Sequence, residues 1–308
     1  MIVPIVFMVI SGLGFYFSGL SVDFIFDDMF FRMSRNLLLV ASLIIPVISG
    51  LGLNFGIVIG AMAGQIGILF IINYGFSGMT GIVVAMLVSI PFAIGLGYLV
   101  GLVLNRAKGK EMITSMILGF FANGIYQLVF IILAGRVIPF SNTNMLVNTG
   151  QGLKNTIDLL TIRKAFDNFI FGDLTRYPIA PLIFVALIFI LIKLFFKTKL
   201  GQDMRAIGQN MHVASVAGID VDKTRIKATI MSTILAAWGQ IVYLQNLGTF
   251  NTYTHHEQVG LFSVAALLIG GASVDKATWK EAVIGTFLFH LLFIVSPQAG
   301  QTLMGDAQ

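Results

Sequence analysis

The sequence predicts an all-α, polytopic integral membrane protein, and three observations support this prediction. Hydrophobic residues make up 57% of the chain and charged residues only 11%, whereas soluble domains carry about 25% charged residues. The mean hydropathy is +0.92. Apolar runs of about 20 residues, the length of a transmembrane helix, recur along the chain. No linker separates them, so we expect a single transmembrane domain over residues 1–308.

The N-terminal half is expected to cross the membrane five times. Met1–Leu20 is apolar and lacks the leading cations and small-residue cleavage site of a signal peptide, so it is expected to be a retained span. Asp23–Arg35 is then expected to be a short polar connection. No Asp, Glu, Lys or Arg occurs from Leu37 to Asn105, which leaves room for three crossings. The four expected crossings after the first are Leu37–Leu51, Phe55–Asn73, Gly81–Leu104 and Met112–Ala134.

The C-terminal half is expected to add four crossings, which makes about nine transmembrane helices. They are Pro178–Phe196, Ala228–Leu247, Val259–Ile269 and Ala282–Ser296. Val259–Ile269 is too short for an ordinary span, so we expect a tilted or broken helix that ends at Gly270. The stretch after Pro297 is polar and is expected to be a connection, with another apolar span following Gln308 in the full-length product.

Positive charge indicates which loops face the cytoplasm. The loop around Lys108 and the segment Lys197–Lys227 are both cationic, and the latter holds six Lys/Arg and three Asp. Placing both inside puts the N-terminus in the cytoplasm and residues 136–177 outside, where Ile162–Phe171 is expected to be a surface helix. The net charge of +5 is therefore assigned to cytoplasmic loops, and no nucleic-acid partner is expected.

The cationic segment Lys197–Lys227 contains signals for two short helices. Asp203–Ile207 is expected to be helical and to end at a left-handed Gly208. Asn210 is expected to cap a second helix over Met211–Ala217, which Gly218 closes. Asp220 or Asp222 is expected to cap the following span.

Four apolar residues of this segment recur at near-helical spacing, namely Met204, Ile207, Met211 and Ala214. They predict a small apolar knob on a charged loop. Such a knob either docks into a groove of another protein or lies on the bilayer surface.

The pattern LGQDMRAIGQNMHVASVAGIDVDKTR resembles the cytoplasmic signature of ABC-importer permeases of the branched-chain amino acid, monosaccharide and nucleoside superfamily. The matching positions are Leu200, Gly201, Arg205, Ala206, Gly208, Asn210, Ala214, Ala217, Gly218, Ile219 and Val221. The stretch Gly50–Gln65 is similar to a second landmark of that family. The resemblance implies that the segment contacts an ATPase subunit, through Met204, Arg205, Ala206, Ile207, Gly208, Asn210, Met211, Ala214 and Gly218.

The resemblance also implies the setting of the chain. Permeases of this family sit in the bacterial inner membrane, usually cross it ten times, and pair with a second permease, identical or homologous. Two ATPases dock on the cytoplasmic side, and a solute-binding protein delivers substrate from outside. Transport then proceeds by alternating access. The chain itself is expected to need no cofactor and to catalyse no covalent reaction, and it contains neither Cys nor a P-loop motif.

Uncharged polar residues within the apolar runs are candidates for lining a translocation path. We expect this path to involve Asn54, Phe55, Gln65, Asn123, Gln127, Gln240 and Asn246. The alternative is hydrogen bonding between helices, since buried amides in lipid need partners. A neutral lining suits a sugar or nucleoside, and a branched-chain amino acid is not excluded.

Two further patterns have a structural and a functional interpretation. Gly52, Gly56, Gly60 and Gly64 recur every four residues and predict close helix packing, with or without a path beside it. His255-His256-Glu257 is expected to be a solvated external turn rather than a metal site, because adjacent His residues point apart. A secondary transporter or a membrane enzyme remains the alternative class, although no Asp or Glu lies centrally in an expected span.

Overall fold

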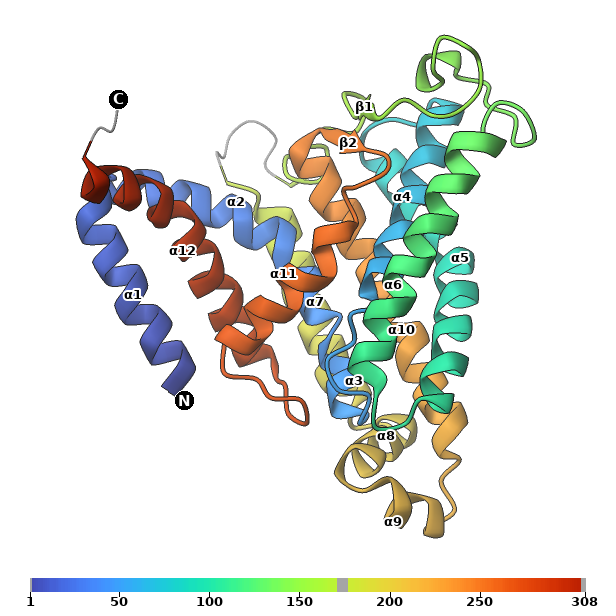
Figure 1. Cartoon of the computed structure of the whole chain (residues 1–308), viewed down its shortest axis with the longest axis vertical. Helices are drawn as coiled ribbons and strands as arrows, with labels where there is room; N and C mark the ends of the chain where they lie inside the picture. The colour runs from blue at the N-terminus through green and yellow to red at the C-terminus, as the bar shows by residue number, and fades with distance from the viewer. Residues whose placement is uncertain (1, 171–176, 306–308) are drawn as a thin grey trace.

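The computed structural model describes residues 2–170 and 177–305, and these residues are mostly helical (Figure 1). In chain order the helices are α1 (Ile2–Ser18), α2 (Val22–Ala41), α3 (Ile44–Ile48), α4 (Ile57–Tyr74), α5 (Gly78–Arg106), α6 (Glu111–Leu128, extended by a π-helical turn over Val129–Leu133), α7 (Ile179–Phe195), α8 (Lys199–Gln209), α9 (Met211–Val216), α10 (Val221–Leu247), α11 (Glu257–Ile269) and α12 (Trp279–Met304). The segment between α6 and α7 adds a 3-10 turn, Thr143–Met145, and strand β1 (Thr156–Asp158), which pairs antiparallel with β2 (Thr249–Asn251).

Several helices are long and apolar enough to cross a membrane. Among the described residues five segments meet this condition by length and composition, namely Val22–Ile48, α4, α5, Glu111–Leu133 and α12. The pair α7 and α8, bent by 80°, forms a sixth if it is counted as one span, and α1 and α11 are shorter apolar helices. The chain is therefore a multi-pass membrane protein, and nine crossings remain a prediction.

Helix α10 lies at the centre of the main bundle and packs against α2, α3, α4 and α5 (Figure 1). Its hydroxyl and amide side chains, including Thr233 and Gln240, are buried. Because protein rather than lipid surrounds these groups, the helix can carry more polar residues than a lipid-facing span. The sequence expectation for 228–247 thus agrees with a helix at this place.

Glycines let the backbones of α4 and α10 approach closely. A Cβ at Gly60 would lie 2.6 Å from the carbonyl oxygen of Thr233, and one at Gly64 would overlap the carbonyl oxygen of Ala237. Gly52 and Gly56 precede the helix and do not share this contact. The packing interpretation of the glycine pattern is therefore confirmed for the two members within α4.

The first long span differs from the sequence expectation. Asp23–Arg35 is not a polar connection but part of α2, so that prediction is wrong. The Ser21 hydroxyl caps the helix by accepting from the Phe24 amide at 3.3 Å, and Asp28 pairs with Arg32 one turn later at 2.8 Å. Charges that looked like a loop therefore stabilise a helix.

A break separates α2 from α3. Pro46 has no amide hydrogen, so it cannot bond to the carbonyl of Ser42 as a helical residue would. The Ser232 hydroxyl of α10 donates to that carbonyl instead, at 2.8 Å. The carbonyl left free at the break thus receives a hydrogen bond from a neighbouring helix, as an interrupted backbone within a membrane requires.

Two other expectations about helices are wrong. The stretch after Pro297 is helical as far as Met304, because α12 continues through the proline. Residues 162–170 form successive turns rather than a surface helix, and Phe171 lies outside the described residues. The short helix expected at Val259–Ile269 is confirmed as α11, which ends at Gly270.

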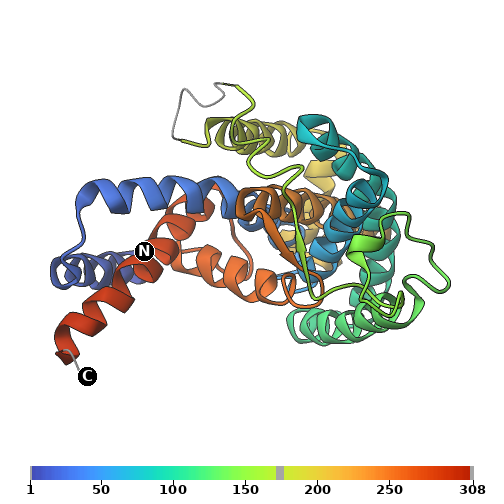
Figure 2. The same ribbon diagram turned by 90° about the horizontal axis from the view of Figure 1, so that it is seen from above.

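Seen from above, α1 and α12 lie with the N-terminal part of α2 to one side of the main bundle (Figure 2). Helices α8 and α9 lie at the end of the molecule opposite to β1 and β2 (Figure 1). The fold therefore separates the cationic segment from the segment between α6 and α7, with the long helices between them.

Candidate functional site

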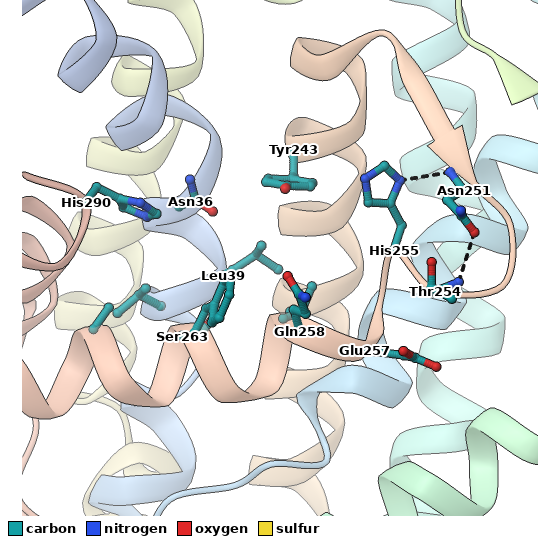
Figure 3. Close-up of a pocket in the computed structure, with 14 residues that line it drawn as sticks. Asn36, Leu39, Tyr243, Asn251, Thr254, His255, Glu257, Gln258, Ser263 and His290 are labelled. Carbon is teal, nitrogen blue, oxygen red and sulfur yellow. Dashed lines mark hydrogen bonds between the residues drawn. The ribbon is translucent and has the colours of Figure 1, made fainter. Parts of the chain in front are cut away.

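A polar cavity of about 270 Å³ lies between α2, α10, α11, α12 and the turn before α11 (Figure 3). Its walls carry amides, hydroxyls, imidazoles and one carboxylate beside several apolar side chains. The lining residues are Asn36, Leu39, Val40, Tyr243, Asn251, Thr254, His255, Glu257, Gln258, Val259, Phe262, Ser263, Ala266 and His290. Such a mixture of apolar walls and a few oriented polar groups is typical of a small-molecule site.

Hydrogen bonds hold the turn that forms one wall of this cavity. The backbone N–H of Asn251 donates to His255 Nδ1 at 2.9 Å, and the side-chain oxygen of Asn251 accepts from the backbone N–H of Thr254 at 3.2 Å (Figure 3). Because Nδ1 of His255 accepts, a neutral ring carries its proton on Nε2. His255 can therefore offer a hydrogen-bond donor from a fixed position.

The next residue, His256, is fully buried and joins three helices. Its Nδ1 lies 2.9 Å from Gln65 Oε1 on α4, and its Nε2 lies 2.8 Å from Asn123 Oδ1 on α6. Asn123 Nδ2 in turn donates to Glu257 at 2.7 Å, while Gln127 bonds back to Asn123 at 3.2 Å. The expectation of a solvated turn at His255-His256-Glu257 is therefore wrong for His256, whereas Glu257 is exposed.

The protonation of this network follows from its carboxylate. Glu257 accepts from the Asn123 amide nitrogen, so the Asn123 oxygen faces His256 and Nε2 of His256 donates. A neutral His256 then needs a donor at Nδ1. Gln65 Nε2 has no partner among the described residues, and turning that amide over lets Nε2 donate to Nδ1. A single neutral tautomer thus pairs both ring nitrogens of His256.

None of the seven residues predicted to line the path lies in the main cavity wall. Gln65, Asn123 and Gln127 come together in the His256 network. Asn54 caps its own turn by accepting from Gly56 at 2.9 Å. Phe55 lines a second hollow of about 320 Å³ that shares Glu257 and Gln258 with the main cavity.

The remaining two predicted path residues lie on α10. Gln240 donates to the His255 carbonyl at 3.4 Å, and Asn246 accepts from Arg35 at 3.3 Å. The main cavity instead uses residues that the sequence reasoning missed. Asn36 was missed because it lay between the expected connection Asp23–Arg35 and the expected span Leu37–Leu51, and His290 is a single polar residue in an apolar run.

A buried carboxylate fastens the segment between α6 and α7 to α10. Asp167 accepts from Gln245 Nε2 and from Asn246 Nδ2, each at 2.7 Å. Burial raises the pKa of Asp167 above its usual value, and the two amide hydrogen bonds offset part of that effect. Arg35 connects this cluster to the cavity, because its guanidinium also lies 5.9 Å from the Tyr243 ring.

At the other end of the molecule, the cationic segment forms α8 and α9. Asn210 caps α9 by accepting from the His212 and Val213 amides, at 3.0 and 3.1 Å, and Gly218 follows with a φ of 86°. Asp220 caps α10 by accepting from the Lys223 amide at 3.1 Å. The predicted second helix and its caps are confirmed.

Gly208 has a different role from the one expected. It lies within α8 and its φ is not positive, so the prediction of a left-handed terminus is wrong. A Cβ there would overlap the carbonyl oxygen of Ile48, which ends α3. Gly50, with a φ of 70°, approaches from the other side, and its own Cβ would lie 3.1 Å from Gly208 Cα. The glycines permit α8 to touch the backbone after α3.

The structure also differs from the predicted apolar knob. Met204, Ile207 and Ala214 are buried against the rest of the chain, so they do not form an exposed docking surface. The exposed apolar side chains are Val213 and Val216 on α9, which are 62% and 77% exposed. The periodicity was therefore correct, but the face that it marks packs inward.

No group of three or more potential metal ligands occurs in the described ranges 2–170 and 177–305.

Comparison with known proteins assigns the chain to a family. The ribose import permease protein RbsC of Bacillus subtilis (strain 168) is 26% identical over 57% of this chain and 55% of its own length. The fructose import permease protein FruG of Bifidobacterium longum (strain NCC 2705) is 23% identical over 99% of this chain and 91% of its own. The nucleoside permease protein NupB of Lactococcus lactis subsp. cremoris (strain MG1363) is 24% identical over 72% and 57%, respectively.

The match spans only about half of the ribose permease, and no solved structure matches the chain. The model of the branched-chain amino acid transport system permease component matches residues 25–306. This match includes the cavity, the His256 network and the cationic segment. The chain therefore belongs to the family of branched-chain amino acid transport system permease components.

Proposed function

We propose that this chain is the membrane-spanning permease subunit of an ABC importer in a bacterial inner membrane. The observation that carries the proposal is a continuous connection between the two ends of the molecule. Helix α8 touches the end of α3 through Gly208, and a short break of two residues joins α3 to α2. Helix α2 supplies Asn36 and Leu39 to the cavity. A displacement of α8 can therefore reach the residues that would hold a solute.

The proposed substrate is a small neutral solute with several hydroxyl groups, such as a sugar or a nucleoside. Amide, hydroxyl and imidazole groups in the cavity can both donate and accept, while the rings of Tyr243 and Phe262 offer apolar surface. Glu257 is the one carboxylate that the described residues bring to this wall, and one of its oxygens accepts from Asn123. The relatives named for ribose, fructose and nucleosides support this class, and a branched-chain amino acid is the alternative.

The partners follow from the same mechanism. Two ATPase subunits would dock at the segment Met204–Gly218 and hydrolyse ATP, a second permease would complete the path, and a solute-binding protein would deliver the solute. The exposed residues of this segment include Arg205 on α8 and the apolar Val213 and Val216 on α9, and these are available for contact. Nine crossings, including α1, α7, α10 and α11, would place the N-terminus inside. Closure of the ATPases would then switch the cavity between the two sides.

The experiment is reconstitution of the permease with its ATPase and binding-protein partners in liposomes. A ligand screen on the binding protein identifies the solute, and uptake of that solute is measured with and without ATP. We expect uptake only when ATP and all subunits are present. Uptake by the permease alone, driven by an ion gradient, would refute the proposal and indicate a secondary transporter.

The cavity itself is tested by Asn36→Leu, with Ser141→Ala on the external segment as control. We expect the first variant to lower uptake while the ATPase subunits still bind, because it removes an amide from the cavity wall. The control should transport at the wild-type rate. Unchanged uptake by Asn36→Leu would place the path elsewhere, for example at the seven residues predicted from the sequence.

A further inference from the structure

A buried ion pair connects the cationic segment to α6. Arg225, in the second turn of α10, is 0% exposed. Its Nη2 lies 2.5 Å from Oε1 of Glu111, the first residue of α6, and its Nη1 lies 3.2 Å from Sδ of Met211 on α9. One guanidinium therefore holds three helices together where α9 turns into α10.

This pair is poorly explained as a source of stability. Removing two charges from water is costly, and an apolar pair of similar volume often stabilises a protein equally well. A buried guanidinium does fix the relative positions of the helices that it bonds, because its planar group donates hydrogen bonds in defined directions. Breaking such a pair leaves one charge buried without a partner, so the helices that it joins are expected to move together.

An exposed ion pair provides a natural comparison. Lys108, in the loop before α6, pairs with Asp222, in the first turn of α10, at 2.5 Å. It joins the same two segments of the chain, but its side chains are 44% and 60% exposed. Exposed pairs contribute little and exchange readily with water. Both pairs thus connect the start of α10 to the region where α6 begins, but one pair is buried and the other is exposed.

Helix α6 leads from this pair to the middle of the molecule. It carries Asn123, which bonds both His256 and Glu257, and Glu257 borders the main cavity. A second mechanical route therefore runs from α9 through Arg225 and along α6, independent of the contact between α8 and α3.

We propose that Arg225 and Glu111 are positioning residues for energy coupling, which fasten the start of α6 to α9 and α10. Movement of the cytoplasmic helices then carries α6 and the network at Asn123 with it. The inference rests on the proposed function, since it assigns a role within coupled transport. It concerns residues outside the ATPase-contact segment as well as outside the cavity wall.

The test uses the complete transporter in liposomes and measures uptake per ATP hydrolysed. Glu111→Gln removes one charge at nearly constant volume and should lower this ratio about tenfold, within the usual range of coupling between sites. The charge-exchanged variant Glu111→Arg/Arg225→Glu should recover most of the loss. The exposed control, Lys108→Gln/Asp222→Asn, should stay near wild type. A wild-type ratio for Glu111→Gln, or an equal loss in the control, would overturn the proposal.

A second measurement needs no disruptive variant. Spin labels at the exposed positions Met112 on α6 and Ser215 on α9 report the distance between the two helices. We expect this distance to stay constant between nucleotide-free and ATP-bound complexes, and a change of several ångströms would overturn the proposal. Loss of ATP-driven uptake in the wild-type complex would instead refute the proposed function, while the distance would still test the link.

Discussion

Replacing Gly208 by alanine or valine tests whether α8 acts through its contact with α3. Gly208 lies inside α8 with ordinary helical geometry, so a side chain causes no backbone strain. In an open helix, Gly→Ala would stabilise by roughly 0.5–1 kcal/mol. Here the added Cβ would overlap the Ile48 carbonyl oxygen and lie 3.2 Å from the Gly50 nitrogen.

The contact is between backbones, so it cannot be relieved by turning a side chain. Overpacking of this kind costs about 1–3 kcal/mol, which exceeds the helix-propensity gain. We therefore expect Gly208→Ala to weaken the docking of α8 against α3 by about 1 kcal/mol, and Gly208→Val to weaken it by more. A change of one to two kcal/mol corresponds to a factor of roughly 5–30 in the equilibrium between docked and undocked α8.

The assay is uptake and ATP hydrolysis by the reconstituted complex, measured on the same liposomes. Transport should fall in the order wild type, Gly208→Ala, Gly208→Val, and stimulation of the ATPase by the loaded binding protein should fall with it. Gly95→Ala is the matched control, because it lies in helix α5 and a Cβ there meets no atom within 4 Å. If Gly208→Val assembles and transports at the wild-type rate, the contact between α8 and α3 does not couple the subunits.

Three further predictions concern orientation and the two polar clusters. Single cysteines at Lys108 and Lys223 should resist an impermeant label in intact cells while one at Asn148 reacts, and labelling at Lys223 would reverse the proposed topology. Asp167→Asn should loosen the segment between α6 and α7 by about 1–3 kcal/mol, because one amide of α10 loses its acceptor, and faster proteolysis of residues 136–177 measures this. His256→Leu should leave Gln65 and Asn123 unpaired and lower the melting temperature of the purified permease, and an unchanged melting temperature would contradict the network.

The broad fold could be predicted from the sequence because transmembrane helices depend on local composition. Runs free of charge gave the helices α4, α5 and α6, and the caps Asn210 and Asp220 were visible as short polar signals. The error at α2 has a physical cause. Asp28 and Arg32 neutralise each other one helical turn apart, and composition alone cannot distinguish such a pair from two loop charges.

The site was harder to predict because burial depends on which helices meet. The spacing of Met204, Ile207 and Ala214 marked an apolar face correctly, but not whether this chain or a partner covers it. His256 looked like part of an exposed turn. Its partners, Gln65 and Asn123, are far away in the sequence, so only the packing of α4 against α6 reveals that the imidazole is buried.

The break between α2 and α3 determines where movement of α8 can enter the membrane domain. In a continuous helix, bending breaks backbone hydrogen bonds, but the bond that Pro46 would donate to Ser42 is already absent. Ser232 supplies a side-chain hydroxyl to that carbonyl, at 2.8 Å, and a hydroxyl can follow a small shift by rotating. Bending at the break therefore costs less than bending elsewhere along α2. A push from α8 on Ile48 should tilt α3 at this point and displace the C-terminal end of α2, where Leu39 and Val40 line the cavity.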